Sequence, residues 1–382
     1  MEKVARMRKI VVGAAMAAAV SASAQVPDLF DAFEMGGRSL GMGGGMYSNA
    51  ADPSASYWNP ANLSLIGEAQ FELNFRNLPA TETRLSGRVD DPERDTNARF
   101  GGSSITFGGI VLPIGTRGTL GVSYARGGFY HDREFGIQLD GGDGVNVDIN
   151  DLLRVDNEFL TVAWGLPSRG RTNIGVGVVL ARQHILSDTF RRIDDGQETT
   201  VIDDPPVSDD GFGVGGIVGF QFTPPNNPNV SFGISYRTPI RVNMDKLDAI
   251  SNEIPGRLQA GFVWRRDGLR GGRDYLIGGV DGAWYFEANR NKPSGLKRDG
   301  HAAAGVGIEY NWAQSFGYVP IRLGFRAVQD AGDGFASRSA FTFGVGYRPF
   351  DANYWIDLNL AAVSGQSSPD LAISITSRIG KK

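Results

Sequence analysis

Cysteine is absent from this sequence of 382 residues, so disulfide bonds, thiolate metal ligands and a cysteine nucleophile are excluded. Long apolar runs are absent as well. After residue 24, no run approaches the roughly 20 apolar residues that a membrane-spanning helix requires. A helical membrane protein is therefore excluded, and stability has to come from backbone pairing.

Histidine is also scarce. His131, His184 and His301 are the only imidazoles, and none has the spacing to a serine or a carboxylate that a nucleophilic or acid–base site would need. The glycine run at 41–46 is not a nucleotide loop, because Met46 occupies the position of the third glycine in GxGxxG and no strand precedes it. From the sequence we therefore expect a protein that is not an enzyme, with no catalytic residue and no cofactor.

No part of the sequence concentrates positive charge. The whole chain has a formal net charge of −4. Without residues 1–24, which carry four basic residues and one acidic residue, 34 basic and 41 acidic residues remain, a formal charge of −7. Nucleic-acid binding depends on a basic face, so we expect no nucleic-acid partner.

Acidic residues instead gather in two of the expected loops. Neither loop has the ligand spacing of a calcium-binding EF-hand, so we predict no metal site and favour solvated loops. Divalent bridging to lipopolysaccharide is the alternative. The residues concerned are Asp140, Asp143, Asp148 and Asp151 in one loop, and Asp194, Asp195, Glu198, Asp203, Asp204, Asp209 and Asp210 in the other.

The first 24 residues have the features of a secretory signal peptide. Four basic residues precede a short apolar stretch at 10–20, and Ala22-Ser23-Ala24 forms a cleavage site. We therefore expect residues 1–24 to be removed on export.

Glycine is abundant, with 53 residues, and from residue 69 onward the apolar residues recur with period two. This period places apolar side chains on one face of a strand and the intervening residues on the other. In residues 230–237, for example, Val, Phe, Ile and Tyr alternate with Ser, Gly, Ser and Arg. A periplasmic β-sandwich also alternates, but it rarely needs so much glycine on its second face.

About fourteen such runs are present, an even number as in single-chain bacterial barrels. Long and short connections alternate between them, which is typical of outer loops and periplasmic turns and places both chain ends in the periplasm. The sequence thus predicts an all-β fold, a transmembrane antiparallel β-barrel over 69–382. The expected strands are 69–77, 99–112, 117–127, 155–166, 171–187, 211–223, 229–240, 257–266, 273–287, 301–313, 319–329, 338–349, 353–363 and 370–379.

Residues 25–68 show no clear alternation and many small residues. Such a segment cannot form a core alone, and we expect it inside the barrel as a plug, where glycine lets the backbone approach the wall. Within it, Gly41-Met42-Gly43-Gly44 and Trp58-Asn59-Pro60-Ala61 resemble the N-terminal signature of the FadL family of outer-membrane transporters and of the related PorV-like secretion proteins.

This resemblance implies an outer-membrane channel for passive uptake of hydrophobic compounds such as long-chain fatty acids. It assigns the plug, or hatch, and its gating role to Asn59, Pro60 and Ala61 and to Gly41, Gly43 and Gly44. The implied partners are a hydrophobic small molecule or fatty acid and outer-membrane lipid. A PorV-like role, as the partner of a secretion-system protein, and a purely structural barrel remain alternatives.

Several arginines fall in phase with the lumen-facing residues: Arg76, Arg237, Arg265, Arg322, Arg326 and Arg348. Guanidinium groups bind carboxylates in pairs of hydrogen bonds, so these side chains could hold a fatty-acid head group. Glu72, Asp281, Glu309 and Asp357 also point inward and would neutralise them. We favour a structural network that anchors the plug.

Overall fold

The protein is known from a computed structural model. It describes residues 36–86, 95–139, 145–166, 170–194, 199–203, 206–248, 251–291, 297–332, 337–351, 353–364 and 369–380. The expected signal peptide lies outside these residues.

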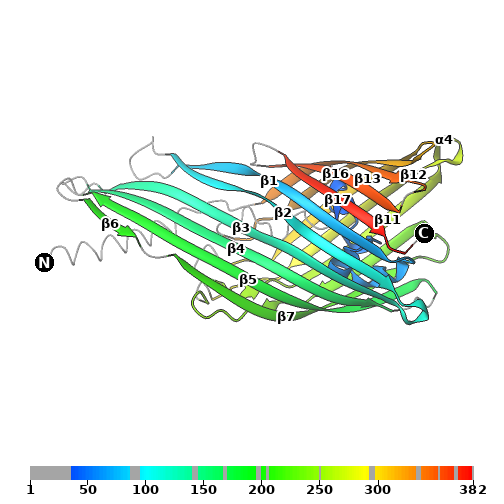
Figure 1. The fold of residues 1–382 in the computed structure, drawn as a ribbon, viewed down its shortest axis with the longest axis horizontal. Coiled ribbons are helices and arrows are strands. Elements are labelled where there is room, and N and C mark those ends of the chain that lie inside the picture. Colours follow the sequence, from blue (N-terminus) through cyan, green and yellow to red (C-terminus); the bar gives the residue numbers. More distant parts are fainter. Residues whose placement is uncertain are drawn as a thin grey trace.

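Fourteen antiparallel strands form a closed barrel in the described part of the chain (Figure 1). Each strand pairs with its neighbours in order, β1 pairs with β17, and the pairing of β4 with β5 completes the ring. Closure leaves no open sheet edge within the membrane, which confirms the predicted fold class. The barrel strands are β1 (Gln70–Ser86), β2 (Asp95–Pro113), β3 (Thr119–Leu139), β4 (Val145–Gly165), β5 (Thr172–Asp194), β7 (Val207–Phe222), β8 (Val230–Arg237), β11 (Arg257–Gly268), β12 (Asp274–Tyr285), β13 (His301–Ala313), β14 (Gly317–Val328), β15 (Arg338–Pro349), β16 (Tyr354–Val363) and β17 (Asp370–Arg378).

Three shorter strands and two helical turns lie outside this ring. β6 (Thr199–Asp203) pairs with the end of β5, and β9 (Ile240–Arg241) pairs with β10 (Glu253–Ile254). A 3₁₀ turn, η3 (Gly115–Arg117), and the short α4 (Leu269–Gly272) occupy connections between barrel strands. No helix in the described ranges is long and apolar enough to span a membrane.

The predicted ends of the first strands were wrong. Residues 78–98, 128–154 and 188–210 were expected to be long loops, yet β1 to β5 and β7 continue through much of these ranges. Cross-strand pairing extends strands through glycine- and aspartate-rich sequence that has low intrinsic strand propensity. The barrel is therefore much taller over β1 to β7 than over β8 to β17 (Figure 1).

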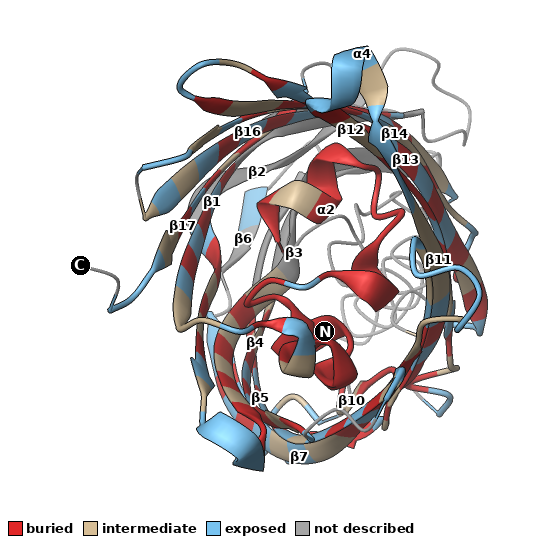
Figure 2. Cartoon of the chain, turned by 90° about the vertical axis from the view of Figure 1, so that its right-hand side faces the viewer, coloured by how far each residue is buried: buried red, intermediate tan, exposed pale blue. Residues whose placement is uncertain are grey.

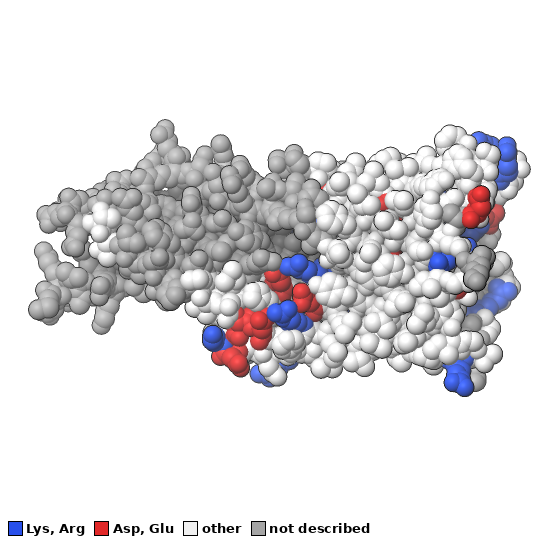
Figure 3. All heavy atoms as spheres, in the orientation of Figure 1, with Lys and Arg blue, Asp and Glu red and all other residues white. Residues whose placement is uncertain are grey.

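An apolar band surrounds the barrel on its outer face. In β5, for example, Ile174, Val176, Val178 and Leu180 point outward and are between 43% and 51% exposed. Figure 3 shows this face of the barrel largely free of charge between two charged zones. Such a band is the expected surface of a barrel in contact with lipid.

A row of ion pairs marks one edge of this band on the tall side of the barrel. Arg182 binds Glu158 and Asp210, at 3.2 and 2.9 Å, and Arg126 binds Asp156 at 3.1 Å. These charges follow directly on the outward apolar residues of the same strands, so they indicate where lipid contact ends and water begins.

Residues 36–68, which precede β1, lie inside the barrel, near the end where the chain also terminates (Figures 1 and 2). It forms four short helical turns, namely α2 (Gly37–Gly41), η1 (Tyr47–Asn49), α3 (Ala55–Trp58) and η2 (Pro60–Leu65). Most of its residues are buried (Figure 2), as expected for a plug in the lumen.

A charged residue in the apolar band should destabilise the barrel. We expect Val178→Arg to lower the free energy of folding into lipid vesicles by about 2–4 kcal/mol, because its charge would face hydrocarbon. The control is Ser208→Arg, at an exposed site beyond the row of ion pairs. Urea titrations in vesicles compare the two, and equal destabilisation would contradict the placement of the band.

Candidate functional site

The plug, defined as residues 36–68, is held together by its own turns. Its backbone hydrogen bonds are short-range, such as Gly43 N to Leu40 O (2.9 Å) and Asn59 N to Ala55 O (3.0 Å). Within the described chain, no backbone bond joins residues 36–66 to a barrel strand. The plug is thus a separate body inside a closed ladder, attached through side chains and close packing.

The plug contacts nearly the whole circumference of the wall. α2 packs against β14 to β17, η1 against β8 and β11, and α3 against β3 and β4. η2 packs against β3, β4, β5 and β7. The segment therefore lies across the lumen, with contacts on opposite sides of the wall.

Wall glycines make this close fit possible. A Cβ atom added at Gly233 would overlap Ser48 O, one at Gly175 would overlap the Pro60 carbonyl, and one at Gly305 would overlap Gly43 O. Gly219, Gly279, Gly307 and Gly324 meet the plug in the same way. The abundance of glycine on lumen-facing positions therefore has a specific cause, which is the approach of plug backbone to wall backbone.

Plug glycines also matter through their own conformation. Gly43 and Gly44 have φ values of 61° and 75°, in the left-handed region that L side chains rarely adopt. Gly41 lies against Asn359 and Arg322 of the wall. All three glycines named by the family resemblance are therefore at points of tight packing or unusual backbone.

Asn59 connects two parts of the plug to the wall. Its side-chain amide donates to Ser48 O (2.8 Å) and to Phe220 O of β7 (3.2 Å), and its Oδ1 accepts from Ala61 N (3.2 Å). Pro60 begins η2, where its missing N–H costs nothing. The Asn-Pro-Ala sequence thus forms a capped turn fastened to both η1 and the barrel.

A buried charge network holds the other end of the plug. Arg38 donates to Glu309 of β13 through Nε (2.9 Å) and a terminal nitrogen (2.8 Å). Arg322 donates to the same Glu309 carboxylate (2.6 Å) and also pairs with Asp357 (2.7 Å). Arg348 lies 3.6 Å from the Glu309 carboxylate. Glu309 is fully buried, so its charge depends on these guanidinium groups.

Burial and pairing act in opposite directions on the plug's ionisable groups. Burial alone would lower the pKa of Arg38, but the adjacent Glu309 carboxylate raises that pKa above its ordinary value. Burial raises the pKa of the Asp52 carboxyl, although hydrogen bonds from Ser54 and the charge of Arg38 partly oppose this. Arg38 therefore stays charged and remains a lasting anchor.

Aromatic residues of the plug contact wall arginines. Tyr47 and Trp58 stack with ring centroids 3.9 Å apart. Arg257 lies over the Trp58 ring, 4.3 Å from its centroid, and Arg326 lies 5.3 Å from that of Tyr47. These cation–π contacts join the centre of the plug to β11 and β14.

The structure separates the arginines that the sequence had grouped. Arg322 and Arg348 meet at Glu309, Arg326 covers Tyr47, and Arg237 donates to the Tyr57 hydroxyl (3.0 Å). Arg76 pairs with Asp370 (2.5 Å) on the wall.

Arg265 lies apart from this group. Its side chain is 48% exposed, pairs with Asp267 (2.7 Å) and lies over the Tyr275 ring. These contacts join Arg265 to wall residues and not to the plug.

Three further plug contacts were missed by sequence reasoning. Arg38 belongs to no strand and so had no phase to indicate its direction. Arg257 is the first residue of β11 and donates to Tyr57 O (3.1 Å). Asp281 was expected to face the lumen, and it also accepts Ser48 N (2.7 Å) of the plug.

The lumen is divided into a charged side and an apolar side. The ion pairs above belong to strands β13 to β17 and β1, whereas a cluster of buried apolar side chains follows β2 to β5 and β7. We call this cluster the apolar column. Its members are Tyr47, Tyr57 and Trp58 of the plug, Phe107, Ala125, Val155, Phe159, Val179, Ala181, Ile185 and Ile217 of the wall, and Ile240, Val242, Met244 and Ile254 between β8 and β11.

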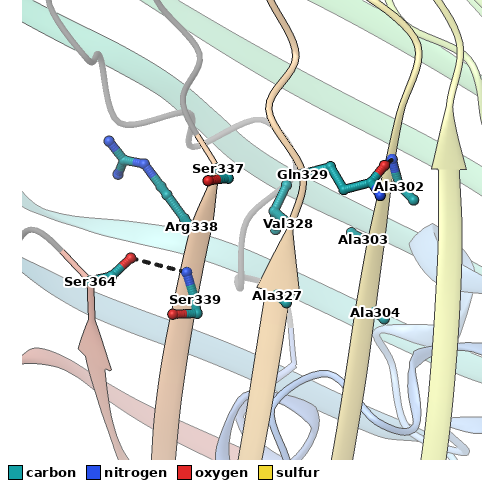
Figure 4. Close-up of a pocket in the computed structure, with 10 residues that line it drawn as sticks. All are labelled: Ala302, Ala303, Ala304, Ala327, Val328, Gln329, Ser337, Arg338, Ser339 and Ser364. Atoms are coloured by element: carbon teal, nitrogen blue, oxygen red, sulfur yellow. Dashed lines mark hydrogen bonds between the residues drawn. The ribbon is translucent and has the colours of Figure 1, made fainter.

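A separate hollow of about 480 Å³ lies at the ends of β13, β14 and β15 (Figure 4). Its lining combines outward-facing residues such as Ala304, Ala327 and Ser339 with residues of the opposite phase such as Ala303 and Arg338. The hollow therefore lies at the rim of the wall, away from the plug.

The three histidines lie apart from one another in the described structure. Among the described residues, no group of three histidine or acidic side chains converges on a cation position. His301 is buried and stacks on Tyr285, and His184 pairs with Asp210 on the outer face. His131 lies in β3, at a position where only the backbone is described.

Fold and lumen together define a membrane β-barrel with residues 36–68 of the chain packed in its lumen. Solved structures share the barrel fold. A Pseudomonas aeruginosa FadL homologue aligns with a TM-score of 0.60 and 15% identity over 93% of this chain and 99% of its own. The toluene transporter TbuX of Ralstonia pickettii aligns with a TM-score of 0.61 and 15% identity, over 92% and 100%.

The P. putida toluene transporter TodX gives a TM-score of 0.61 at 13% identity, over 92% and 100% of the two chains. No family model and no curated protein sequence matches the chain. The protein therefore has the fold of FadL homologues and toluene transporters, as its N-terminal sequence indicated.

The glycine contacts can be tested by adding a methyl group. We expect Gly233→Ala to displace the plug while the barrel still forms, because the new Cβ would overlap Ser48 O. Limited proteolysis in detergent should cleave residues 36–68 several times faster. Gly216→Ala is the control, since its Cβ would meet only one atom, at 3.8 Å. Equal cleavage of both variants and the parent would contradict the tight fit.

Proposed function

We propose that this protein is an outer-membrane channel for the passive uptake of hydrophobic compounds, including long-chain fatty acids, and that its plug is the gate. Its fold matches a FadL homologue and two toluene transporters. No cofactor or energy source is part of the proposal. A ligand would enter at the outer end, follow the apolar column and leave when the plug shifts.

The apolar column is the observation that carries this proposal. It extends from the outer end of β8 to the aromatic residues of the plug, and its members are at most 7% exposed. Buried apolar side chains in a lumen otherwise lined with charge supply the surface that an apolar ligand needs. Because the column ends at Tyr57 and Trp58, a ligand that occupied it would press on the plug.

Two arginines border this column close to the plug. Arg237 and Arg257 are 3% and 1% exposed, and neither forms an ion pair with any carboxylate that the structure describes. The Nε atom of each also lacks a hydrogen-bond partner there. A buried guanidinium without a counter-ion favours an anionic ligand, so this pair would hold the head group of a fatty acid.

An interruption in the wall offers a second way out. β2 pairs with β3 at Ala98 with Arg133 and again at Phe107 with Ala125. Along these two described strands, no pairs join residues 99–106 of β2 to 126–132 of β3. A ligand would be able to leave sideways here more easily than through a continuous ladder.

The plug turn provides a direct test of gating. We expect the combined change Asn59→Gly, Pro60→Ser and Ala61→Gly to raise conductance in planar bilayers, because it removes the bonds to Ser48 and Phe220 and the fixed start of η2. The control makes Asn227→Gly, Pro228→Ser and Asn229→Gly in a turn between β7 and β8. Unchanged conductance in the first variant would count against a plug that gates.

The arginine pair tests substrate class. We expect Arg237→Gln with Arg257→Gln to slow oleate uptake into cells about tenfold, the effect of losing a charged hydrogen bond worth ~1.5–3 kcal/mol. Toluene uptake should not slow, because toluene has no charge for these arginines to bind. Arg378→Gln, at an exposed pair with Glu68, is the control. Equal slowing of both compounds would argue against head-group binding.

The tall side of the barrel favours one second candidate, a secretion partner like the PorV-like proteins. β3, β4 and β5 are 21, 21 and 23 residues long and extend beyond the row of ion pairs, as a surface for another protein would. Lipid extraction and mass spectrometry of purified protein separate the two functions. Stoichiometric fatty acid or hydrocarbon supports uptake, whereas a co-purifying protein without such a ligand supports the partner role.

A further inference from the structure

The chain between β8 and β11 turns into the lumen. β8 ends at Arg237, and residues 238–248 and 251–256, which we call the inward hairpin, fold over the inner face of β7. β9 and β10 form its short ladder, and Val242 N donates to Asn252 O (2.8 Å). Figure 2 shows β10 inside the ring, beside β7.

A strip of glycines on β7 receives this hairpin. A Cβ atom at Gly211 would overlap Met244 and Val242, one at Gly213 would overlap Arg241 O, and one at Gly215 would collide with Ile240. The same device that seats the plug, wall glycine against incoming backbone, is thus repeated nearer the outer end of the barrel.

Asp209 fastens one arm of the hairpin. Its Oδ2 accepts Lys246 N (2.5 Å) and Leu247 N (2.8 Å), and its Oδ1 accepts Asp210 N (2.9 Å). Hydrogen bonds from backbone N–H groups to a carboxylate are among the stronger ones in proteins. The side chain is directed inward, while that of Asp210 faces Arg182 and His184 on the outer surface.

Asn289 fastens the other arm from the connection between β12 and β13. Its Oδ1 accepts Asn252 N and Glu253 N, both at 3.1 Å, and its Nδ2 donates to Ser251 Oγ (3.1 Å). Asn289 has a φ of 55°, a conformation that is rare for a residue with a side chain. Two side chains from different parts of the wall therefore clasp the two arms.

We propose that the inward hairpin is an outer gate, which closes the outer end of the apolar column and opens independently of the plug when the clasps at Asp209 and Asn289 release. In the closed state Ile240, Val242, Met244 and Ile254 complete the column and are at most 7% exposed. Neither clasp touches the plug, and the apolar column packs between the hairpin at one end and Tyr57 and Trp58 of the plug at the other.

Thiol labelling tests the gate without any transport assay. The chain has no cysteine, so Met244→Cys places a single thiol on the inward hairpin itself, at a buried position of the apolar column. In proteoliposomes this thiol should react slowly with a water-soluble maleimide. Adding Asp209→Ala should accelerate its labelling about tenfold or more, since labelling follows the open population and the lost bonds involve a charged group.

Three further variants keep the test decisive. Asp210→Ala, which removes a neighbouring carboxylate from the outer face, should leave labelling at the parent rate. Asn289→Gly should accelerate it, because it removes the second clasp while tolerating the positive φ. Ser208→Cys, at an exposed site of β7 next to Asp209, gives the labelling rate of a thiol that is always accessible.

The proposal would be overturned if Asp209→Ala and Asn289→Gly both left the thiol labelling at the parent rate. It would also be overturned if the control Asp210→Ala accelerated labelling as much as Asp209→Ala does. Heat-modifiable mobility in gels confirms that each barrel is folded. Because labelling does not depend on any substrate, failure of the outer gate and failure of the uptake function give different results.

Discussion

Closure of the backbone ladder is the constraint on which the rest of the structure depends. In lipid, wall N–H and C=O groups must be paired, and the antiparallel ring from β1 to β17 does this along most of its length, with the interruption between β2 and β3. Where a strand is already paired on both sides, it has no ladder bonds to offer to a segment in the lumen. The plug must therefore be held by side chains and by close packing on glycine, and these are contacts that can be exchanged without opening the wall.

The two kinds of attachment have different consequences. The ion pair from Arg38 to Glu309 has a fully buried carboxylate, and removing Arg38 or the wall partner Arg322 would leave that charge less compensated. Arg38 thus holds the start of the plug firmly to the charged side. The Asn59 turn and the stacked aromatic residues face the apolar column, where the described contacts are hydrogen bonds, apolar packing and cation–π contacts and not ion pairs. Movement of the plug should thus begin on the apolar side, where a hydrophobic ligand would arrive.

Much of the wall could be predicted from sequence, because period-two alternation reports directly on which side chains meet lipid. It placed Arg322, Arg326 and Arg348 on the lumen face. It could not extend β3 to β5 through aspartate- and glycine-rich stretches, where pairing with a neighbour overrides weak local propensity. Contacts such as Arg38 with Glu309, 271 residues apart, depend on the path of the plug through the lumen, and no periodic signal records that path.

Hydrogen–deuterium exchange of the protein in lipid nanodiscs tests the central claim most directly. If the plug is a separate body inside a closed ladder, amides of residues 41–61 should exchange at least about a hundredfold faster than those of β12 to β14, because they open without unfolding the wall. Exchange of the plug at the same slow rate as these strands would show that plug and wall open only together, and would contradict the account.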